Sequence, residues 1–139
     1  VGCLVNGKVF LPHAEGINSP VNCFYQFVNG EFYFNLHFAD LRGVISTDVV
    51  VQTSKITLEV GKTYILNKNI VDDGDFTGGG VFAPPSIIRF YTTTIKTGEL
   101  RITRVDVQNS ILSGTFWFDA VNTKEEIAEI REGRFDWNY

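Results

Sequence analysis

The sequence predicts an all-β domain: an antiparallel β-sandwich of about nine to eleven short strands, with a partly open β-barrel as the alternative. Three observations lead to this prediction. Apolar and polar residues alternate over many short segments, as in strands that bury one face. Glycine-containing turns separate these segments at short intervals. Aromatic residues make up 14% of the 139 residues, and such rings favour pleated, half-buried strands.

Two Asn-Gly dipeptides mark hairpins near the amino terminus. Asn6-Gly7 separates apolar residues 3–5 from residues 8–11, and Asn29-Gly30 separates residues 21–28 from residues 31–38. Asn-Gly is a strong hairpin signal because both turn positions require positive φ. In residues 31–38 the alternation has period two over the whole segment, which predicts one buried and one polar face. The buried face comprises Phe32, Phe34, Leu36 and Phe38.

The middle of the chain predicts strands over residues 44–52, 56–60 and 63–66, followed by one long loop. The loop covers residues 67–86, where glycines, prolines and aspartates interrupt every periodicity. Long loops in compact domains are often functional or mobile.

Alternation returns in the last third of the sequence, at residues 88–93, 100–107, 112–118 and 134–139. Within residues 100–107 the apolar phase slips by one residue at Arg104, which predicts a β-bulge.

Residues 123–132 leave two interpretations open. Thr123 and Glu126 fit a helix capping box, and Gly133 could end the helix. However, the segment is short and lies among strands, where an isolated short helix is marginal. We favour a strand here, with a helix as the alternative.

The length and charge of the chain limit its function classes. A chain of 139 residues predicts a single domain spanning residues 1–139 with a substantial core. The net charge is −4, and the acidic excess lies in residues 72–139. Without a basic stripe, nucleic acid is not an expected partner. No apolar run reaches the ~20 residues of a membrane helix.

Cys3 and Cys23 are the two cysteines of the chain. In a secreted domain they could pair, and a disulfide closing a loop of this size stabilises a fold by about 3 kcal/mol. Two buried thiols, which pack as small hydrophobic side chains, are an equally good interpretation.

Three carboxylates in the central loop, Asp72, Asp73 and Asp75, are candidate ligands for calcium, a cation that binds oxygen donors. They lack the spacing of an EF-hand, and a solvated acidic turn is the alternative. No other cofactor is expected.

Tyr33, Tyr91 and Trp117 are predicted on faces opposite the phenylalanine-rich ones. Exposed rings can stack on a sugar or anchor a protein partner, so these three are the candidate binding residues; simple packing is the alternative.

Catalytic patterns are absent from the sequence. It contains neither G-x-S-x-G nor H-E-x-x-H, and neither His13 nor His37 has a metal-ligand partner nearby. His37 is expected to be an exposed strand residue. We therefore expect no catalytic residues and no enzyme, while a carboxylate pair of the glycosidase type keeps a hydrolase as a minor alternative.

Four short motifs resemble one family. They are Gly-Cys-Leu-Val-Asn-Gly-Lys-Val at residues 2–9, Gly-Glu-Leu-Arg-Ile-Thr at 98–103, Ile-Leu-Ser-Gly-Thr-Phe-Trp-Phe-Asp-Ala at 111–120, and Glu-Gly-Arg-Phe-Asp at 132–136. Together they resemble a family of unknown function found in predicted secreted lipoproteins of Bacteroidetes-type bacteria. Residues 40–90 contain no motif that adds to this resemblance.

The resemblance implies a signal peptide and a lipid-bearing cysteine upstream of Val1, and hence an extracytoplasmic domain, periplasmic or on the cell surface. It also implies a strand for residues 125–131, and it carries no activity. We therefore expect a non-catalytic structural or protein-interaction role, with a glycan- or small-ligand-binding module as the alternative. The expected partner is a protein or glycan, and contact with the membrane is expected only through the upstream lipid anchor.

Overall fold

The computed structural model describes residues 1–70 and 78–139, and within them it contains eleven strands. The strands are β1 (Gly2–Val5), β2 (Lys8–Phe10), β3 (Val21–Val28), β4 (Glu31–Asp40), β5 (Thr47–Ser54), β6 (Thr63–Leu66), β7 (Gly78–Ala83), β8 (Phe90–Tyr91), β9 (Gly98–Asp106), β10 (Ile111–Val121) and β11 (Ile127–Asn138).

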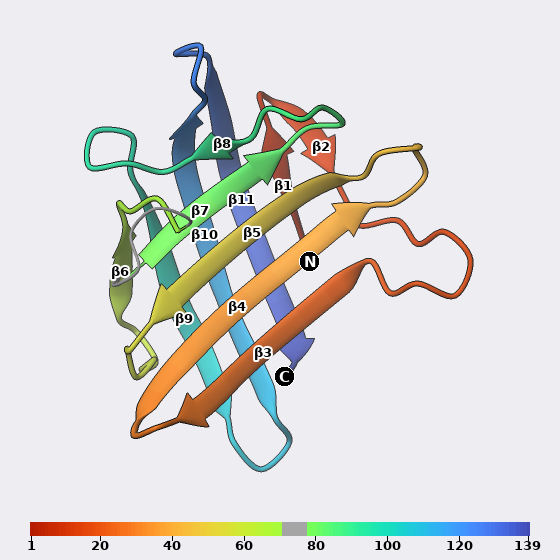
Figure 1. Cartoon of the computed structure of the whole chain (residues 1–139). Helices are drawn as coiled ribbons and strands as arrows, with labels where there is room; N and C mark the ends of the chain where they lie inside the picture. Colours follow the sequence, from red (N-terminus) through yellow and green to blue (C-terminus); the bar gives the residue numbers. More distant parts are fainter. Residues whose placement is uncertain (71–77) are drawn as a thin grey trace.

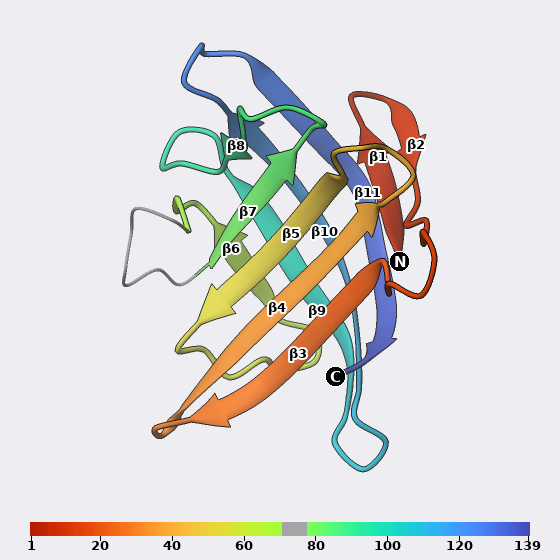
Figure 2. The same ribbon diagram turned by 45° about the vertical axis from the view of Figure 1, so that its right-hand side comes forward.

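All named strands belong to one antiparallel sheet with the order β2-β1-β11-β10-β8-β7-β5-β4-β3, and β9 and β6 continue from β10 on a second branch. The sheet curls, so that β3, β4, β5 and β7 form a front layer that crosses over β9, β10 and β11 behind it (Figures 1 and 2). The predicted all-β, antiparallel fold is confirmed. Because one continuous sheet supplies both layers, the arrangement is close to the partly open barrel.

The core lies between the two layers and is built from the inward faces of the alternating strands. Phe34 and Phe38 of β4 are buried, as are Phe116 of β10 and Phe135 of β11. Ring centroids lie 5.7 Å apart for Phe34 and Phe135 and 6.1 Å apart for Phe38 and Phe116, so aromatic pairs join the front layer to the back layer.

Both Asn-Gly hairpins are confirmed. Asn6 and Gly7 have φ of 48° and 78°, and Asn29 and Gly30 have φ of 51° and 89°. These values correspond to the twist-compatible turn that Asn-Gly favours.

The predicted loop over residues 67–86 is wrong in its second half, because β7 is a central strand between β5 and β8. Three glycines of β7 have no side chains, so the strand shows no alternation in the sequence. Gly80 lies directly against the ring of Phe118, and a Cβ at Gly79 would lie 2.5 Å from the carbonyl oxygen of Lys68. Glycine is therefore required for close approach on both faces of this strand.

The predicted strand over residues 56–60 is also wrong. This segment pairs with no strand, although Leu58 is buried. The N–H of Leu58 donates instead to the hydroxyl of Tyr25 at 2.9 Å, and the N–H of Ile56 donates to the carbonyl oxygen of Phe32. An alternating pattern shows only that one face of a segment is buried. An extended segment held by single hydrogen bonds gives the same pattern as a strand.

The strand interpretation of residues 123–132 is confirmed for β11, which begins at Ile127. Residues 123–126 form the preceding turn, in which the side-chain oxygen of Asn122 accepts hydrogen bonds from the N–H groups of Lys124 and Glu126. The bulge predicted near Arg104 is present, because Ser113 faces Arg104 while the next residue, Gly114, faces Ile102.

Truncation of Phe116 to alanine is expected to lower the free energy of unfolding by about 3–5 kcal/mol, because the ring is 3% exposed and contacts three other core rings. The measurement is a urea melt followed by tryptophan fluorescence. Thr115→Ala, one position earlier on the exposed face of β10, is the control and should cost under about 1 kcal/mol. Equal losses in the two variants would contradict the facing of β10.

Candidate functional site

A hollow of about 440 Å³ lies on the outer face of the front layer and is the candidate site. Its floor comes from neighbouring strands β4, β5 and β7, and its walls come from residues before β7 and around β8. The lining residues are Asn35, His37, Ser46, Asp48, Val50, Gln52, Ile70, Val81, Ala83, Arg89 and Tyr91. Apolar and hydrogen-bonding groups are thus mixed in one concave surface, as in small-molecule sites.

Two amide side chains form the first polar group of the site. Asn35 of β4 and Gln52 of β5 face each other in register, and the Gln52 amide nitrogen donates to the Asn35 side-chain oxygen at 2.5 Å. Asn35 is only 7% exposed. Within the described residues this pair makes no other side-chain hydrogen bond, which leaves the Asn35 nitrogen and the Gln52 oxygen for a ligand.

A carboxylate organises the second polar group. Asp48 Oδ1 lies 2.7 Å from His37 Nε2, and Asp48 Oδ2 accepts a hydrogen bond from the Ser46 hydroxyl at 2.7 Å. His37 is therefore fixed by a partner on β5 and is not the solitary exposed histidine that the sequence suggests. The carboxylate lies between the hydroxyl and the imidazole, so the three groups do not follow the order of a serine–histidine–aspartate triad, in which the imidazole contacts the hydroxyl.

Ile70, which forms one wall of the hollow, belongs to a segment held against β7. Thr92, which is fully buried, donates a hydrogen bond to the carbonyl oxygen of Lys68 at 2.8 Å and accepts one from the N–H of Gly80 at 2.9 Å. A Cβ at Gly79 would collide with Ile70. The missing side chain therefore lets Ile70 approach the sheet and cover one side of the hollow.

Ser46 lies in the loop between β4 and β5, and an ion pair between Asp40 and Arg42 is found at the start of this loop. Arg42 Nη2 lies 2.6 Å from Asp40 Oδ2, and Arg42 Nε donates to Asp40 Oδ1 at 2.9 Å. These bonds lower the pKa of Asp40 to about 2, so its carboxyl group stays ionised at neutral and mildly acidic pH.

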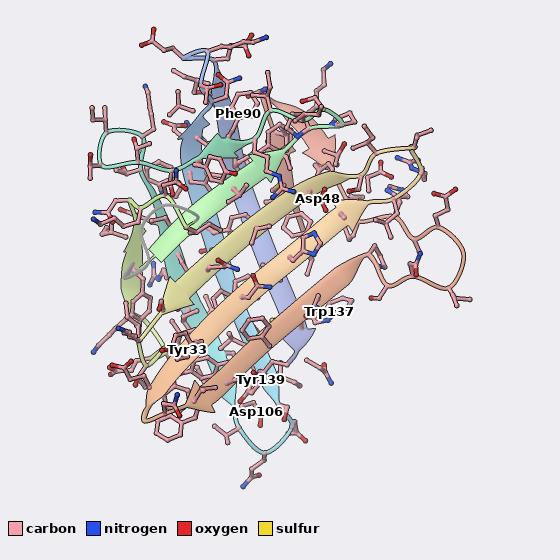
Figure 3. The ribbon with its side chains drawn as sticks, viewed as in Figure 1. Tyr33, Asp48, Phe90, Asp106, Trp137 and Tyr139 are labelled. Carbon is pink, nitrogen blue, oxygen red and sulfur yellow. The ribbon has the colours of Figure 1, made fainter. Side chains whose placement is uncertain are left out.

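The structure does not bring the three predicted binding aromatics together. Tyr91 lines the hollow. Tyr33 lies on β4 well away from Asp48, near the opposite end of the front layer (Figure 3). Trp117 lies on β10 in the back layer, where its indole N–H donates to Glu99 and Arg131 stacks 5.5 Å from its ring centroid. Tyr91 alone belongs to the candidate site.

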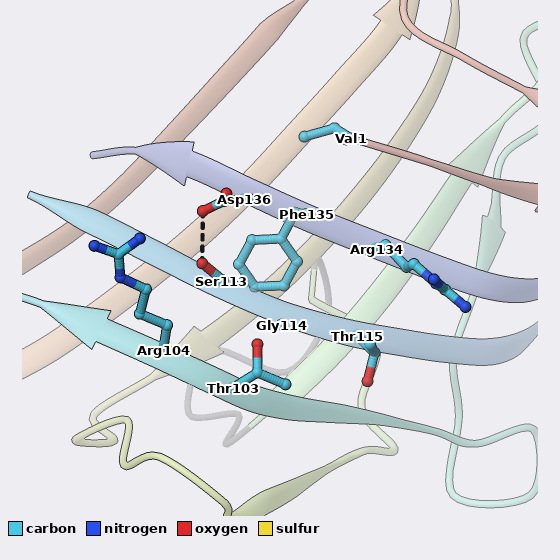
Figure 4. Close-up of a pocket in the computed structure, with 9 residues that line it drawn as sticks. All are labelled: Val1, Thr103, Arg104, Ser113, Gly114, Thr115, Arg134, Phe135 and Asp136. Carbon is cyan, nitrogen blue, oxygen red and sulfur yellow. Dashed lines mark hydrogen bonds between the residues drawn. The ribbon is translucent and has the colours of Figure 1, made fainter.

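A second hollow, of about 520 Å³, lies on the back layer over β9, β10 and β11 (Figure 4). The Ser113 hydroxyl donates to Asp136 at 2.6 Å there, while Arg104 and Arg134 point away from each other. Its polar groups do not converge on one point. This hollow is therefore the weaker candidate.

The predicted calcium ligands Asp72, Asp73 and Asp75 lie outside the described residues. In the part of the chain that the structure describes, histidine, cysteine and carboxylate side chains form no cluster able to hold a metal ion. Over the same residues, no helix has the length and apolar character needed to cross a membrane.

Cys3 and Cys23 are both free thiols in the structure, so the disulfide alternative is not present there. Cys3 lies in the hydrophobic core and Cys23 packs against it. Burial raises the pKa of each thiol to about 12.

Comparison with known protein families finds a match for this chain. Residues 40–136 match the family described as Domain of unknown function (DUF6252). The chain belongs to this family. No curated protein and no solved structure matches the chain. The resemblance to a family of unknown function is thereby confirmed.

The DUF6252 match begins at the end of β4 and runs almost to the end of β11. The match includes residues 40–90, where no motif contributed to the resemblance, and it leaves out the motif at residues 2–9. The site residues of β5, β7 and β8 lie within the match, whereas Asn35 and His37 precede it.

From the sequence, no binding role is predicted for the polar residues of the site that lie on β4, on β5 and in the loop between them, namely Asn35, His37, Ser46, Asp48 and Gln52. One sequence signal could have found them: these residues occupy the polar positions of two strands that are predicted to be consecutive. The register that aligns Asn35 with Gln52, and the position of Ile70 beside them, required the tertiary structure.

The two thiols are expected to resist alkylation by iodoacetamide at pH 8 in the native protein. An ordinary cysteine has a pKa near 8.5 and reacts through its thiolate, whereas raised pKa values keep both groups protonated at that pH. Intact mass should show no adduct under native conditions and adducts on Cys3 and Cys23 in denaturant without reductant. Labelling in denaturant only after reduction would instead reveal a disulfide.

Proposed function

We propose that this DUF6252 chain is a non-catalytic binding module for a small, uncharged polar ligand of the glycan class. The observation that carries the proposal is the half-covered hollow with paired amides, the Asp48–His37 pair and Tyr91. Amide and carboxylate groups exchange hydrogen bonds with hydroxyl groups, while the face of a tyrosine offers an apolar surface for the C–H groups of a sugar ring.

The arrangement of acids supports a role without catalysis. Glycosidases of the usual kind need two carboxyl groups on either side of one bond. Asp48 is the one carboxylate that lines the front hollow, and Asp136 is the one that lines the back hollow. The hydrolase alternative therefore has no supporting pair among the described residues of these hollows.

The proposed setting is extracytoplasmic, in the periplasm or on the cell surface, with the domain tethered by a lipid attached upstream of Val1. The support is the resemblance of the motifs to predicted secreted lipoproteins. The net charge of −4 is consistent with a partner that is a glycan or protein and not nucleic acid.

A structural or protein-interaction role is the second candidate. Its support is a set of large apolar side chains that lie almost fully exposed on separate loops, at Ile17, Val44 and Ile87. Such side chains can anchor a protein partner, although as single residues they are also common on ordinary surfaces.

Ligand binding is tested by a thermal-melt screen against soluble glycans, run with and without calcium. A ligand that binds only the native state stabilises it by about 2.7 kcal/mol at a hundredfold excess over its dissociation constant, which raises the melting temperature. Binding by any glycan that shifts the melt is then measured by calorimetry. We expect Gln52→Ala and Tyr91→Ala each to weaken it about tenfold, since each removes one direct contact.

Trp117→Ala is the matched control, because this exposed aromatic residue lies outside the hollow. It should leave the affinity unchanged. A flat screen with a well-folded protein would contradict the glycan proposal and favour the protein-interaction role. A loss of affinity in Trp117→Ala alone would place the site on the back layer.

A further inference from the structure

Strand β3 is an open edge of the sheet. It ends the strand order after β4, and Figures 1 and 2 show it as the outermost strand of the front layer. The other free edges are shorter, since β2 has three residues and β6 has four, whereas β3 has eight. An open edge presents unpaired N–H and C=O groups that can pair with another strand.

The hairpin turn determines which backbone groups of β3 are open. In a hairpin with the two-residue turn Asn29-Gly30, the flanking residues Val28 and Glu31 form a hydrogen-bonded pair, and such pairs alternate along the strands. The N–H and C=O groups of Cys23, Tyr25 and Phe27 therefore point away from β4.

A local contact agrees with this alternation. Val21 has the same parity, and both its backbone groups contact the Ser19 hydroxyl, at 3.4 Å from the nitrogen and 2.8 Å from the oxygen. Ser19 thus covers the first residue of the edge. The open part begins at Cys23 and extends to Phe27.

The sequence of β3, Val-Asn-Cys-Phe-Tyr-Gln-Phe-Val, has none of the features that usually protect an edge. It contains no charged residue and no proline, and its pairing with β4 is regular without a bulge. Near its end Phe27 is 63% exposed and Val28 is 45% exposed. Apolar area and backbone groups are therefore available together on one strand.

We propose that β3 pairs in antiparallel fashion with β3 of a second copy of this chain, about a two-fold axis at Tyr25. In this register Tyr25 faces its own counterpart and Cys23 faces Phe27 of the other copy, so that every open group gains a partner and Ser19 keeps its contacts with Val21. The front layers of the two copies become one continuous sheet.

The properties of β3 favour a second copy as its occupant. Two identical strands have equal lengths, whereas pairing β3 with β2 of another copy would leave most of β3 uncovered. An uncharged strand can face itself without like charges meeting. A two-fold interface also closes after two copies, which prevents the edge from growing into fibres. The interface lies outside the hollow on β4, β5 and β7.

The first test is sedimentation equilibrium of the wild-type protein and of two variants at Phe27. Phe27→Pro removes the outward N–H and should yield a monomer, while Phe27→Thr keeps this N–H and should remain a dimer. Circular dichroism melts confirm that each variant is folded. A wild-type protein that is monomeric at its highest soluble concentration overturns the proposal, as does a dimer that survives Phe27→Pro.

The second test measures the register by cross-linking. On the outer face Phe24 of one copy faces Gln26 of the other in a non-hydrogen-bonded pair, a geometry whose Cα separation of ~4.5 Å suits a disulfide. Under mild oxidation, a mixture of Phe24→Cys and Gln26→Cys proteins should form covalent dimers, and each variant alone should not. Cross-linking in the single variants, or none in the mixture, overturns this register. Phe27 does not line the hollow, so the Phe27 variants should keep any glycan binding whether or not they dimerise.

Discussion

The contact between Phe118 and Gly80 is the constraint on which the other packing depends. Phe118, fully buried on β10, lies with its ring against the backbone of β7 at Gly80, where a Cβ would collide with the ring. This contact brings the centre of the back layer against the centre of the front layer. The sheet can then curl through the two-residue strand β8 and enclose the phenylalanine core instead of spreading flat.

The same strand also shapes the outer surface. Gly79, the neighbour of Gly80, faces outward and admits Ile70 and the carbonyl oxygen of Lys68 close to the sheet. Thr92 joins that segment to β7 through its hydroxyl group. One run of glycines therefore allows tight packing inside and a covered hollow outside, so the fold and the candidate site have a common origin.

Polar residues in the hollow illustrate how a strand face becomes a site. Along β4 and β5 the outward positions carry amide, imidazole and carboxylate groups, and antiparallel pairing sets them opposite one another. The resulting pairs hold each side chain in place before a ligand arrives, which reduces the ordering cost of binding. At the far end of the same layer, β3 presents only uncharged side chains, so the sheet combines a prepared polar surface with an open edge.

Local sequence patterns are enough to place the strands whose two faces differ in polarity. The alternation in residues 31–38, the two Asn-Gly turns, and the bulge near Arg104 follow from local patterns that a strand in water must satisfy. Only the tertiary structure shows that residues 78–83 form a strand, because their glycines leave no periodic signal. Only the tertiary structure shows that residues 56–60 have no strand partner, because a segment can bury one face without one. It also decided that Asn35 faces Gln52 and that Tyr33, Tyr91 and Trp117 lie apart. A tight turn sets the register within a hairpin, but the pairing of β7 with β5 and the crossing of the layers arise from contacts between residues distant in the chain.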